Sequence, residues 1–538
     1  MSNSTFRKAA LPVLLFAFLV CSFLAGISFG VTCLQDPDTC WMLKMGEVIN
    51  REKSIPKKDP FSFNAQTPDG KPHVYYQWLS EVAFDHAQNL GQFFTGPSIS
   101  KLNNDPSLKG PMLLGAFLCA GAFLAFPFLF FFQAPKRFLI LPVLILAGAQ
   151  ASSFHFYLRP ELFSAFMFSL ELLVLNRIRL AILADPHHYV SRWSILLICL
   201  MMVVWCNLHC GFVLGWIILL LFSVTQSMRV AQPESKHNIY AMLGLGTLCT
   251  LINPWWMGLW GYLLKLFTSP VGARVEELQP LSIFEFVSHT YSLYIVFALA
   301  SLVLLLFTIN KLKSKQGLND LLFSCIAVAM ILVMGIGARR LIPFACILGV
   351  FEWTMILSIL HRYEKVEEHT DSTKSKLSRI WAPGFSIAIC TLTVAGTWWE
   401  SGLFKLQLPQ ASYGFPAPYE AIGYLQSANQ KALEYEKIRG QCLNDPQFGD
   451  MMIYYLGSHS VFIDTRFDIY QDKIVFDFLT MANCQNGWDK LLDQYKIAWI
   501  FLPQHTQLAT FARNHPDQWT TIYSDESALI SRRKNYIR

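Results

Sequence analysis

The stretch Asp36-Pro37-Asp38-Thr39-Cys40-Trp41-Met42-Leu43 follows the first long apolar run, Ala9 to Thr32, and opens a long polar segment. An apolar run of this length, at about 1.5 Å per residue, crosses the roughly 30 Å core of a bilayer. Asp36 and Asp38 are therefore expected at the outer end of a membrane helix. An ionisable group there loses hydration unless it is paired, bound to a metal or facing water. The alternative to a chemical role is that Asp36 or Asp38 caps the helix that follows. One of these aspartates can cap the helix while the other takes part in a reaction.

The composition places the chain in the membrane. Of the 538 residues, 53% are hydrophobic and only 15% are charged, and the mean hydropathy is +0.36. Soluble domains carry about 25% charged residues, so a soluble globular class is excluded. Most of the 13 cysteines lie inside apolar runs, without the spacing of a zinc site. Nothing in the sequence predicts a nucleic-acid partner.

The apolar runs predict a polytopic α-helical membrane protein with about 11 transmembrane helices. Arg7 and Lys8 precede the first run and put the N-terminus inside. An odd number of spans then puts everything after Trp398 outside, and the short-loop cations agree with this topology. After the first run, the spans are expected at about 111–133, 138–153, 161–176, 193–206, 211–228, 239–254, 290–309, 319–338, 341–360 and 380–398.

Two segments outside the membrane have their own structure. The loop 33–109 is too long for a connector, and its pattern predicts helices at about 39–51 and 77–90. We assign it to a transmembrane domain covering residues 1–398. From residue 399 to 538 the composition becomes that of a soluble α/β domain.

The expected elements of the C-terminal α/β domain alternate in type. Strands are predicted at 460–464 and 497–502, and helices at 419–432 and 488–495.

Several cations break the positive-inside trend. Arg159, Arg339 and Arg340 lie near the outer ends of predicted helices. Guanidinium groups bind phosphate oxygens bidentately and keep their charge when partly buried. These arginines are candidates for binding an anionic substrate; anchoring to lipid headgroups or pairing with a carboxylate is the alternative for each.

Polar residues at two outer turns are weaker candidates. Asn207 and His209 lie at the tip of a tight helical pair, where Gly211 and Gly215 allow close approach of the helices. A polar turn with one histidine is more often structural. Glu277, which follows Arg274 in another outer loop, could orient an acceptor hydroxyl or neutralise Arg274.

A series of short motifs resembles a bacterial, largely uncharacterised branch of the C-type (GT-C) glycosyltransferases, along essentially the whole chain. The motifs are Asp38-Thr39-x-Trp41, Ile55-Pro56, Asp59-Pro60-Phe61-Ser62-Phe63, Gln77-Trp78-Leu79-Ser80-Glu81, Arg159-Pro160, Trp205-x-Asn207-Leu208-His209-x-Gly211-Phe212, Asn253-Pro254, Glu277-Leu278-Gln279-Pro280, Arg340-Leu341-Ile342-Pro343-Phe344 and Phe462-Ile463-Asp464-Thr465-Arg466-x-Asp468-x-Tyr470. There are two departures: Met42 stands where the branch often has histidine, and Leu278 stands where a Glu-Trp pair has its second member.

The resemblance implies transfer of a sugar, hexosyl or pentosyl, from a polyprenyl-phosphate carrier to a lipid, glycan or protein acceptor. The setting would be the outer face of a bacterial inner membrane, with a periplasmic C-terminal domain. Asp38, helped by Asp36, would be the catalytic carboxylate, and the two could share a divalent cation, Mg²⁺ or Mn²⁺.

The remaining site residues follow from the same implied reaction. Arg340, Arg339 and Arg159 would bind the donor phosphate. The candidates for lining the cavity or binding the acceptor are His209, Asn207, Glu277, Trp78, Glu81 and Arg466. The competing functions are a non-catalytic carrier or flippase for polyprenyl-linked glycans, which needs no carboxylate, and an envelope-assembly scaffold with an inactive transferase core.

Two local expectations concern the C-terminal domain. Arg466 is expected at the end of a strand and paired with a neighbouring carboxylate, as either an acceptor-binding or a purely structural residue. Cys442 and Cys484 are expected to form a disulfide, with Cys33 and Cys40 as a competing pair.

Overall fold

The computed structural model describes residues 36–65, 73–95, 106–133, 141–268, 276–282, 289–312, 315–368, 417–429, 438–457, 461–470 and 472–534. The chain forms two compact units, which are described separately. The helical unit comprises residues 113–263 and 272–408, and the mixed unit comprises residues 33–112, 264–271 and 409–538. The sequence analysis assigned residues 33–109 to the transmembrane domain, whereas the structure groups them with the C-terminal segment.

The helical unit consists of long apolar helices joined by short connections. Its elements are α4 (Lys109–Ala120, which begins in the mixed unit), the π-helical turn η2 (Gly121–Ala125), α5 (Phe126–Phe131), α6 (Leu141–Ser152), η3 (Ser153–His155), α7 (Glu161–Ala184), α8 (Arg192–Leu208), α9 (Phe212–Ser227), α10 (Pro233–Cys249), α11 (Met257–Phe267), η5 (Glu276–Leu278), α12 (His289–Lys311), α13 (Lys315–Asp320), α14 (Leu322–Gly337), η7 (Arg339–Leu341) and α15 (Ile342–Glu368).

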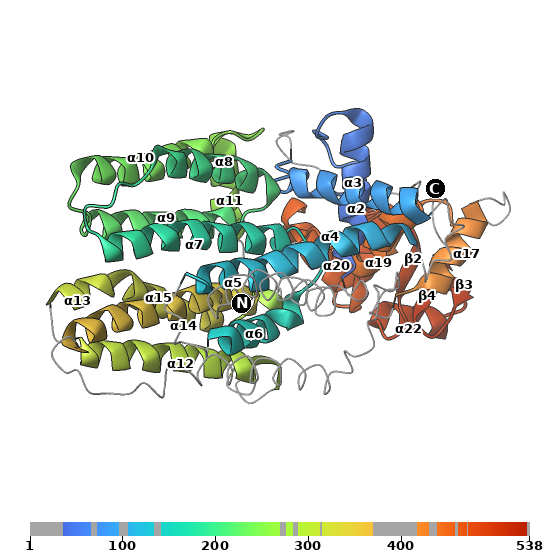
Figure 1. The fold of residues 1–538 in the computed structure, drawn as a ribbon. Coiled ribbons are helices and arrows are strands. Elements are labelled where there is room, and N and C mark those ends of the chain that lie inside the picture. The colour runs from blue at the N-terminus through green and yellow to red at the C-terminus, as the bar shows by residue number, and fades with distance from the viewer. Residues whose placement is uncertain are drawn as a thin grey trace. The chain divides into compact units, whose positions relative to one another are not determined.

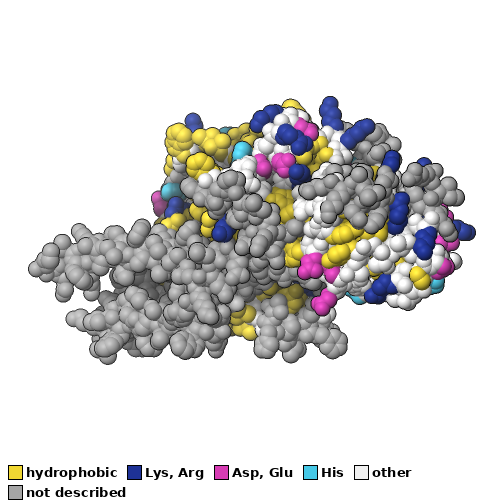
Figure 2. All heavy atoms as spheres, turned by 90° about the vertical axis from the view of Figure 1, so that its right-hand side faces the viewer, with side chains coloured by type: hydrophobic (Ala, Val, Ile, Leu, Met, Phe, Trp, Pro, Cys, Tyr) yellow, Lys and Arg dark blue, Asp and Glu magenta, His cyan; other side chains and the backbone are white. Residues whose placement is uncertain are grey.

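The long helices of this unit pack side by side. Helices α7 to α10 run alongside one another, and α12, α14 and α15 form a second group (Figure 1). Several helices expose one apolar stripe with helical spacing, such as Trp193, Leu197, Leu200 and Val204 on α8. Figure 2 shows the molecule from the side of the mixed unit, where hydrophobic side chains lie among charged ones on the described surface. Stripes of this kind on neighbouring helices are expected to contact lipid.

The predicted spans within the described residues are all helical, although their lengths differ. Three helical segments there are long and apolar enough to cross a membrane: Lys109–Phe131, Tyr291–Lys311 and Arg339–Tyr363. Three shorter helices are also apolar: Arg192–Leu208, Phe212–Ser227 and Leu322–Gly337. The chain is thus a helix-rich, multi-pass membrane protein. The expected spans at 9–32 and 380–398 lie outside the described residues, and the number of about eleven stays a prediction.

The mixed unit combines helices with one small sheet. Its elements are α2 (Asp38–Glu52), α3 (Trp78–Thr95), η1 (Pro106–Leu108), α17 (Tyr419–Asn429), β1 (Gln441–Asn444), α19 (Pro446–Tyr455), η8 (Phe467–Ile469), α20 (Asp472–Ala482), α21 (Trp488–Gln494), β2 (Ile497–Pro503), α22 (Gln507–Asn514), β3 (Trp519–Ser524) and β4 (Ala528–Arg533). The predicted helices at 39–51, 77–90, 419–432 and 488–495 and the strand at 497–502 are confirmed.

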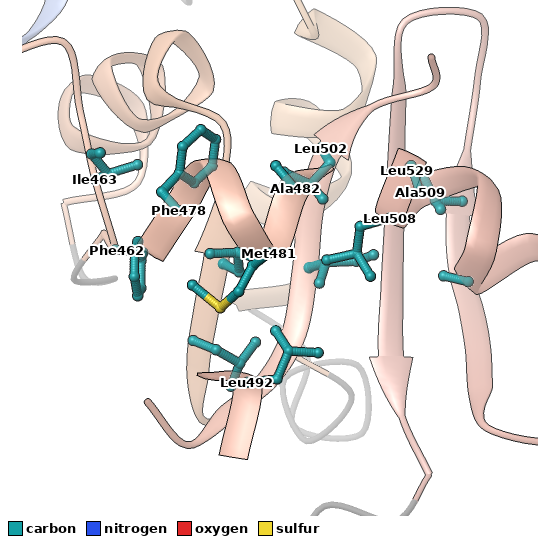
Figure 3. Packing of buried hydrophobic residues seen from close by; sticks show 14 of the residues in the cluster. Phe462, Ile463, Phe478, Met481, Ala482, Leu492, Leu502, Leu508, Ala509 and Leu529 are labelled. Carbon is teal, nitrogen blue, oxygen red and sulfur yellow. The ribbon is translucent and has the colours of Figure 1, made fainter. Parts of the chain in front are cut away.

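The sheet has the order β1-β2-β4-β3. Strands β1 and β2 are parallel, with Leu443 beside Ile500, and the other two pairings are antiparallel. β2 is buried along nearly its whole length, as expected for a central strand covered on both faces. Phe478 and Met481 of α20 and Leu508 of α22 pack with Leu502 of β2 in the buried cluster drawn in Figure 3.

Two predictions about the C-terminal segment are wrong. Residues 460–464 do not form a strand of the sheet: Val461 makes only an isolated parallel bridge to Ser62. Cys442 and Cys484 are both free thiols. Cys442 is buried in β1, whereas Cys484 is half-buried in the turn after α20, so the two side chains belong to different parts of the fold. Cys33, of the competing pair with Cys40, lies outside the described residues, so that pairing stays a prediction.

Candidate functional site

The first carboxylates of the mixed unit lie at the start of α2. The backbone N–H of Asp38 donates to Oδ1 of Asp36 at 3.1 Å, which forms a local turn before the helix. Asp36 is buried, and Asp38 is half-buried in the first turn. A negative charge at this end is favoured by the helix dipole. Asp36 therefore shapes the turn before α2, whose N-cap residue is Pro37 and has no side-chain cap, and the carboxylate of Asp38 remains the candidate for chemistry.

Arg466 is the centre of a buried clamp in the same unit. Its Nε and Nη2 donate to Oδ1 and Oδ2 of Asp464 at 2.9 and 2.6 Å, and its Nη1 donates to Oδ1 of Asp59 at 2.5 Å. The guanidinium also lies 5.3 Å from the ring of Trp41 and 5.1 Å from that of Phe61. Burial alone lowers the pKa of Arg466, but the charges of Asp464 and Asp59 raise it well above its usual value. The predicted pairing with a neighbouring carboxylate is confirmed.

The clamp joins segments that are about 400 residues apart in the sequence. Val461 donates its N–H to the carbonyl of Phe61 at 3.0 Å, and Ser62 Oγ donates to the carbonyl of Val461 at 3.0 Å. Asp59 also accepts the backbone N–H of Ser62 at 2.7 Å. The loop after α2 is thereby fixed to the segment that carries Arg466, which explains why residues 33–112 belong to the mixed unit.

A further buried carboxyl group, that of Asp450 of α19, interacts with Asp38. It accepts the backbone N–H of Thr465 at 3.2 Å and the hydroxyl of Thr465 at 2.8 Å. Burial raises the pKa of Asp450 well above its usual value, and the neighbouring Asp38 and Asp464 raise it further. A neutral Asp450 can stay next to Asp38 without repelling its negative charge.

Glu81 lies on α3 where this helix crosses α2. A Cβ atom at Gly46 of α2 would lie 2.1 Å from the carbonyl oxygen of Glu81, so only glycine allows this close approach. The Glu81 side chain is fully buried, and neither carboxyl oxygen has a hydrogen-bond partner among the described residues. Burial raises the pKa of Glu81 to about 8, against the opposing effects of Arg466 and Gln77. Trp78, also on α3, is half-buried at the start of the helix.

The helical unit carries a separate, basic cluster around Glu161, the first residue of α7. Arg340 donates its Nε–H to both carboxyl oxygens of Glu161, at 2.8 and 2.9 Å. His155 Nε2 donates to Oε2 of Glu161 at 2.9 Å. The two terminal nitrogens of Arg340 make no hydrogen bond to any described residue, and the side chain is 29% exposed. The guanidinium group of Arg340 is therefore held through its Nε on Glu161. Its two terminal nitrogens can still donate hydrogen bonds to a ligand.

Two more predicted arginines belong to the helical unit. Arg159 donates through Nη1 to both oxygens of Glu277, at 3.0 and 2.7 Å, and its guanidinium lies 5.5 Å from the ring of Tyr157. Arg339 adjoins Arg340 in η7, and its backbone N–H donates to the carbonyl of Gln279 at 3.3 Å. Glu277 thus pairs with Arg159, whereas Arg274, the arginine that it was expected to neutralise, lies outside the described residues.

His209 and Asn207 make contacts of a structural kind. His209 Nδ1 accepts the backbone N–H of Gly211 at 3.1 Å and lies 2.9 Å from the hydroxyl of Ser164. Asn207 donates to the carbonyls of Val203 and Ile252, at 2.8 and 2.9 Å, and so joins the end of α8 to another turn. Their proposed place in an acceptor cavity stays a prediction.

The structure thus sorts the predicted site residues into two sets and adds residues that the sequence analysis did not single out. Glu161 and His155 orient Arg340, while Asp450, Asp464 and Asp59 surround Asp38 and Arg466. Among these, only Asp59 and Asp464 stood in quoted motifs. The only available signal for Glu161 was a carboxylate beside the Arg159-Pro160 motif.

The candidate metal ligands were tested against the geometry. Among the described residues there is no group of three or more His, Cys, Asp or Glu side chains arranged to hold a metal ion. One oxygen of Asp36 accepts the N–H of Asp38, and Asp450 is bonded to Thr465. Since Asp36 and Asp38 do not form a complete protein-ligated site in this arrangement, no reaction step is derived through a metal.

The fold of this chain is similar to that of solved structures. No protein-family model and no curated protein matches the chain. Among solved structures it is similar to the archaeal oligosaccharyltransferase AglB from Archaeoglobus fulgidus, in complex with an inhibitory peptide and a dolichol-phosphate. That match has a TM-score of 0.55 and 13% identity, and it covers 91% of this chain and 69% of that chain.

A second structure of the Archaeoglobus fulgidus oligosaccharyltransferase, tethered to an acceptor peptide with an NVT sequon, matches with a TM-score of 0.53 and 12% identity. It covers the same 91% and 69% of the two chains. The fold of this chain is therefore similar to that of these Archaeoglobus fulgidus oligosaccharyltransferases.

Proposed function

We propose that this protein is a GT-C-type glycosyltransferase that moves a sugar or glycan from a polyprenyl-phosphate carrier to a lipid, glycan or protein acceptor. The observation that carries the proposal is the state of Arg340, whose Nε is anchored on Glu161 while its two terminal nitrogens make no hydrogen bond to another residue that the structure describes. A guanidinium held in this way is preorganised to bind phosphate oxygens. The oligosaccharyltransferase fold supports the same reaction class, and its complex with dolichol-phosphate supports a lipid-phosphate donor.

In the proposed reaction, the bond between the sugar C1 and the phosphate oxygen breaks, and a bond between C1 and the acceptor atom forms with inversion. The proton of the acceptor passes to the carboxylate of Asp38, and the negative charge stays on the leaving phosphate. Arg340, with Arg159 and Arg339, stabilises that charge as it grows.

The other charged residues have positioning roles in this proposal. Glu161 and His155 hold Arg340, and Glu277 holds Arg159. Arg466 is buried and all of its donor groups face Asp59 and Asp464. We therefore assign it to the structure of the loop beside α2, in preference to direct contact with the acceptor.

The proposed setting is the inner membrane of a bacterium. The N-terminus would lie inside, about eleven helices would cross the bilayer, and the mixed unit would face the periplasm. A polyprenyl tail cannot leave the lipid phase, which explains why an enzyme of this kind has a membrane-embedded part. A divalent cation, if one takes part, would need further ligands from the donor phosphate or from water beside Asp36 and Asp38.

Mass spectrometry of membrane glycans from cells with and without the protein tests the transfer. We expect one glycan to lose a sugar or an oligosaccharide when the gene is deleted, and the wild-type protein to restore it. Restoration by Asp38→Asn as well would favour the carrier or flippase. Restoration by the mixed unit alone would favour the scaffold, and unchanged glycans would contradict all three functions.

A further inference from the structure

A cavity lies in the mixed unit, apart from the carboxylates at the start of α2. Its volume is about 460 Å³, and it lies between the turn that joins α20 to α21 and the end of the β3–β4 hairpin. Trp519, the first residue of β3, pairs across the hairpin with Arg533, the last residue of β4, and both line the cavity. This volume falls in the range of about 300–1,000 Å³ that is usual for small-molecule sites.

The lining combines buried apolar groups with exposed polar ones. Trp519 and Leu492 are almost fully buried and Trp488 is half-buried. Gln485 and Asn486 are exposed lining residues. Asp489 and Gln518 also line the cavity and are exposed.

Several polar groups of the lining make no hydrogen bond to another residue that the structure describes. They are the side-chain amides of Gln485, Asn486 and Gln518, which are all exposed. The cavity therefore presents several donors and acceptors to a ligand.

The charges in the lining argue against an anionic ligand. Arg533 donates through Nη2 to Asp493 at 2.8 Å and through Nη1 to the carbonyl of Ile497 at 3.4 Å. Its charge is thus already balanced, and Asp489 adds a negative charge to the lining. An apolar ligand is equally disfavoured, because it would leave the amides and the carboxylate without hydrogen bonds.

We propose that this cavity binds a neutral saccharide of one or two pyranose units. Amide and carboxylate groups match pairs of neighbouring sugar hydroxyls, which both donate and accept hydrogen bonds. The indole ring of Trp488, which is half-buried, can pack against the apolar C–H face of a pyranose, since an aromatic ring offers a flat apolar surface with a polar edge. The saccharide site is separate from Asp38 and Arg340, and its assignment does not depend on transfer activity.

Binding can be measured on the full-length protein without turnover. The protein is placed in nanodiscs, with no sugar-based detergent. Saturation-transfer NMR and calorimetry are run with glucose, galactose, mannose, N-acetylglucosamine and their β-linked disaccharides. Inorganic phosphate is the comparison ligand. We expect at least one saccharide to bind saturably, with a Kd of about 1 mM or below, and phosphate not to compete.

The double variant Gln485→Ala/Asn486→Ala should weaken saccharide binding about tenfold, because two hydrogen-bonding amides are lost. The matched control is Gln507→Ala/Asn514→Ala, which removes two exposed amides from α22 outside the cavity and should leave the Kd unchanged. Absence of binding by every saccharide, competition by phosphate, or equal Kd values for the two double variants would overturn the proposal. None of these outcomes bears on glycosyl transfer at Asp38.

Discussion

Arg466 in the mixed unit and Arg340 in the helical unit show two uses of the same side chain. Arg466 is 4% exposed, and its Nε, Nη1 and Nη2 all donate to Asp464 or Asp59. Arg340 uses only its Nε, on Glu161. An arginine whose donors are all used stabilises the protein, whereas one that is anchored at a single edge can still bind a ligand. The hydrogen bonds of each guanidinium therefore indicate its role better than its motif does.

The two clusters also differ in the sign of their excess charge. Around Arg466, the carboxyl groups outnumber the cations: Asp464 and Asp59 pair with its guanidinium, and Glu81 interacts with its charge. Around Glu161, arginines are in excess. A surplus of carboxylates favours the uptake of a proton, and a surplus of arginines favours the binding of phosphate. The following predictions test this division.

The largest effect is expected for Asp38→Asn. Asparagine keeps the size of the side chain but cannot accept the acceptor proton, so transfer should fall by about 10²–10⁴-fold. In Asp36→Asn, the amide oxygen can still accept the N–H of Asp38, and the loss should be much smaller. Turnover and melting temperature of both purified variants check this. Equal rates for wild type and a folded Asp38→Asn protein would remove Asp38 as the base.

Arg466→Ala should lower the free energy of unfolding by about 3–5 kcal/mol, because Asp59 and Asp464 would remain buried without their cation. Arg51→Ala is the matched control, since Arg51 lies on the exposed surface of α2 in the same unit. Denaturant unfolding of both variants measures the difference. If Arg466→Ala kept full stability but bound the acceptor more weakly, Arg466 would be a ligand-binding residue after all.

Glu81→Gln should change how stability depends on pH. The pKa of Glu81 is about 8 in the folded protein against 4.5 for the ordinary group. The native state therefore keeps a proton that the unfolded state has lost, and this stabilisation is complete below about pH 4.5 and disappears as the pH rises through 8. Glutamine has no such proton to lose.

The wild-type protein should lose this stabilisation between pH 5 and pH 8, whereas Glu81→Gln should not. We therefore expect the free energy of unfolding of Glu81→Gln minus that of wild type to rise over this range, by as much as about 4 kcal/mol. Melting temperatures at pH 5, 6.5 and 8 test this. Glu47→Gln is the control, because Glu47 is an exposed residue of α2. Parallel pH curves for wild type and Glu81→Gln would mean that Glu81 is ionised in the folded protein.

The sequence predicted local features better than distant pairings. The periodicity of α2 and α3 was sufficient because a helix depends on near neighbours. The motifs at 59–63 and 462–470 were both recognised, but nothing local shows that Ser62 bridges Val461. For the same reason the spacing of Cys442 and Cys484 gave a wrong disulfide, since it carries no information on their distance in the fold.

The site could be predicted only in part. Arg340 was found because it opposes the positive-inside trend, which is a property of single positions. Its anchor Glu161 was missed, because a glutamate in the first turn of a helix is common and needs no partner. Contacts between helices, such as that of Gly46 with Glu81, depend on packing that a single sequence does not reveal.

The smallest effect, and the sharpest test of the comparison between the arginines, is expected for Arg340→Lys. Lysine keeps the positive charge but replaces the planar fork with one ammonium group, which cannot bind Glu161 at one edge and a phosphate at the other in the same geometry. We expect the KM for the lipid-phosphate donor to rise about tenfold, or about 1.4 kcal/mol, with little change in melting temperature. Arg229→Lys provides the control, because Arg229 pairs with Asp320 elsewhere in the helical unit. If the KM is unchanged in Arg340→Lys and also in Arg340→Ala, the free edge of Arg340 contacts lipid headgroups and not the donor.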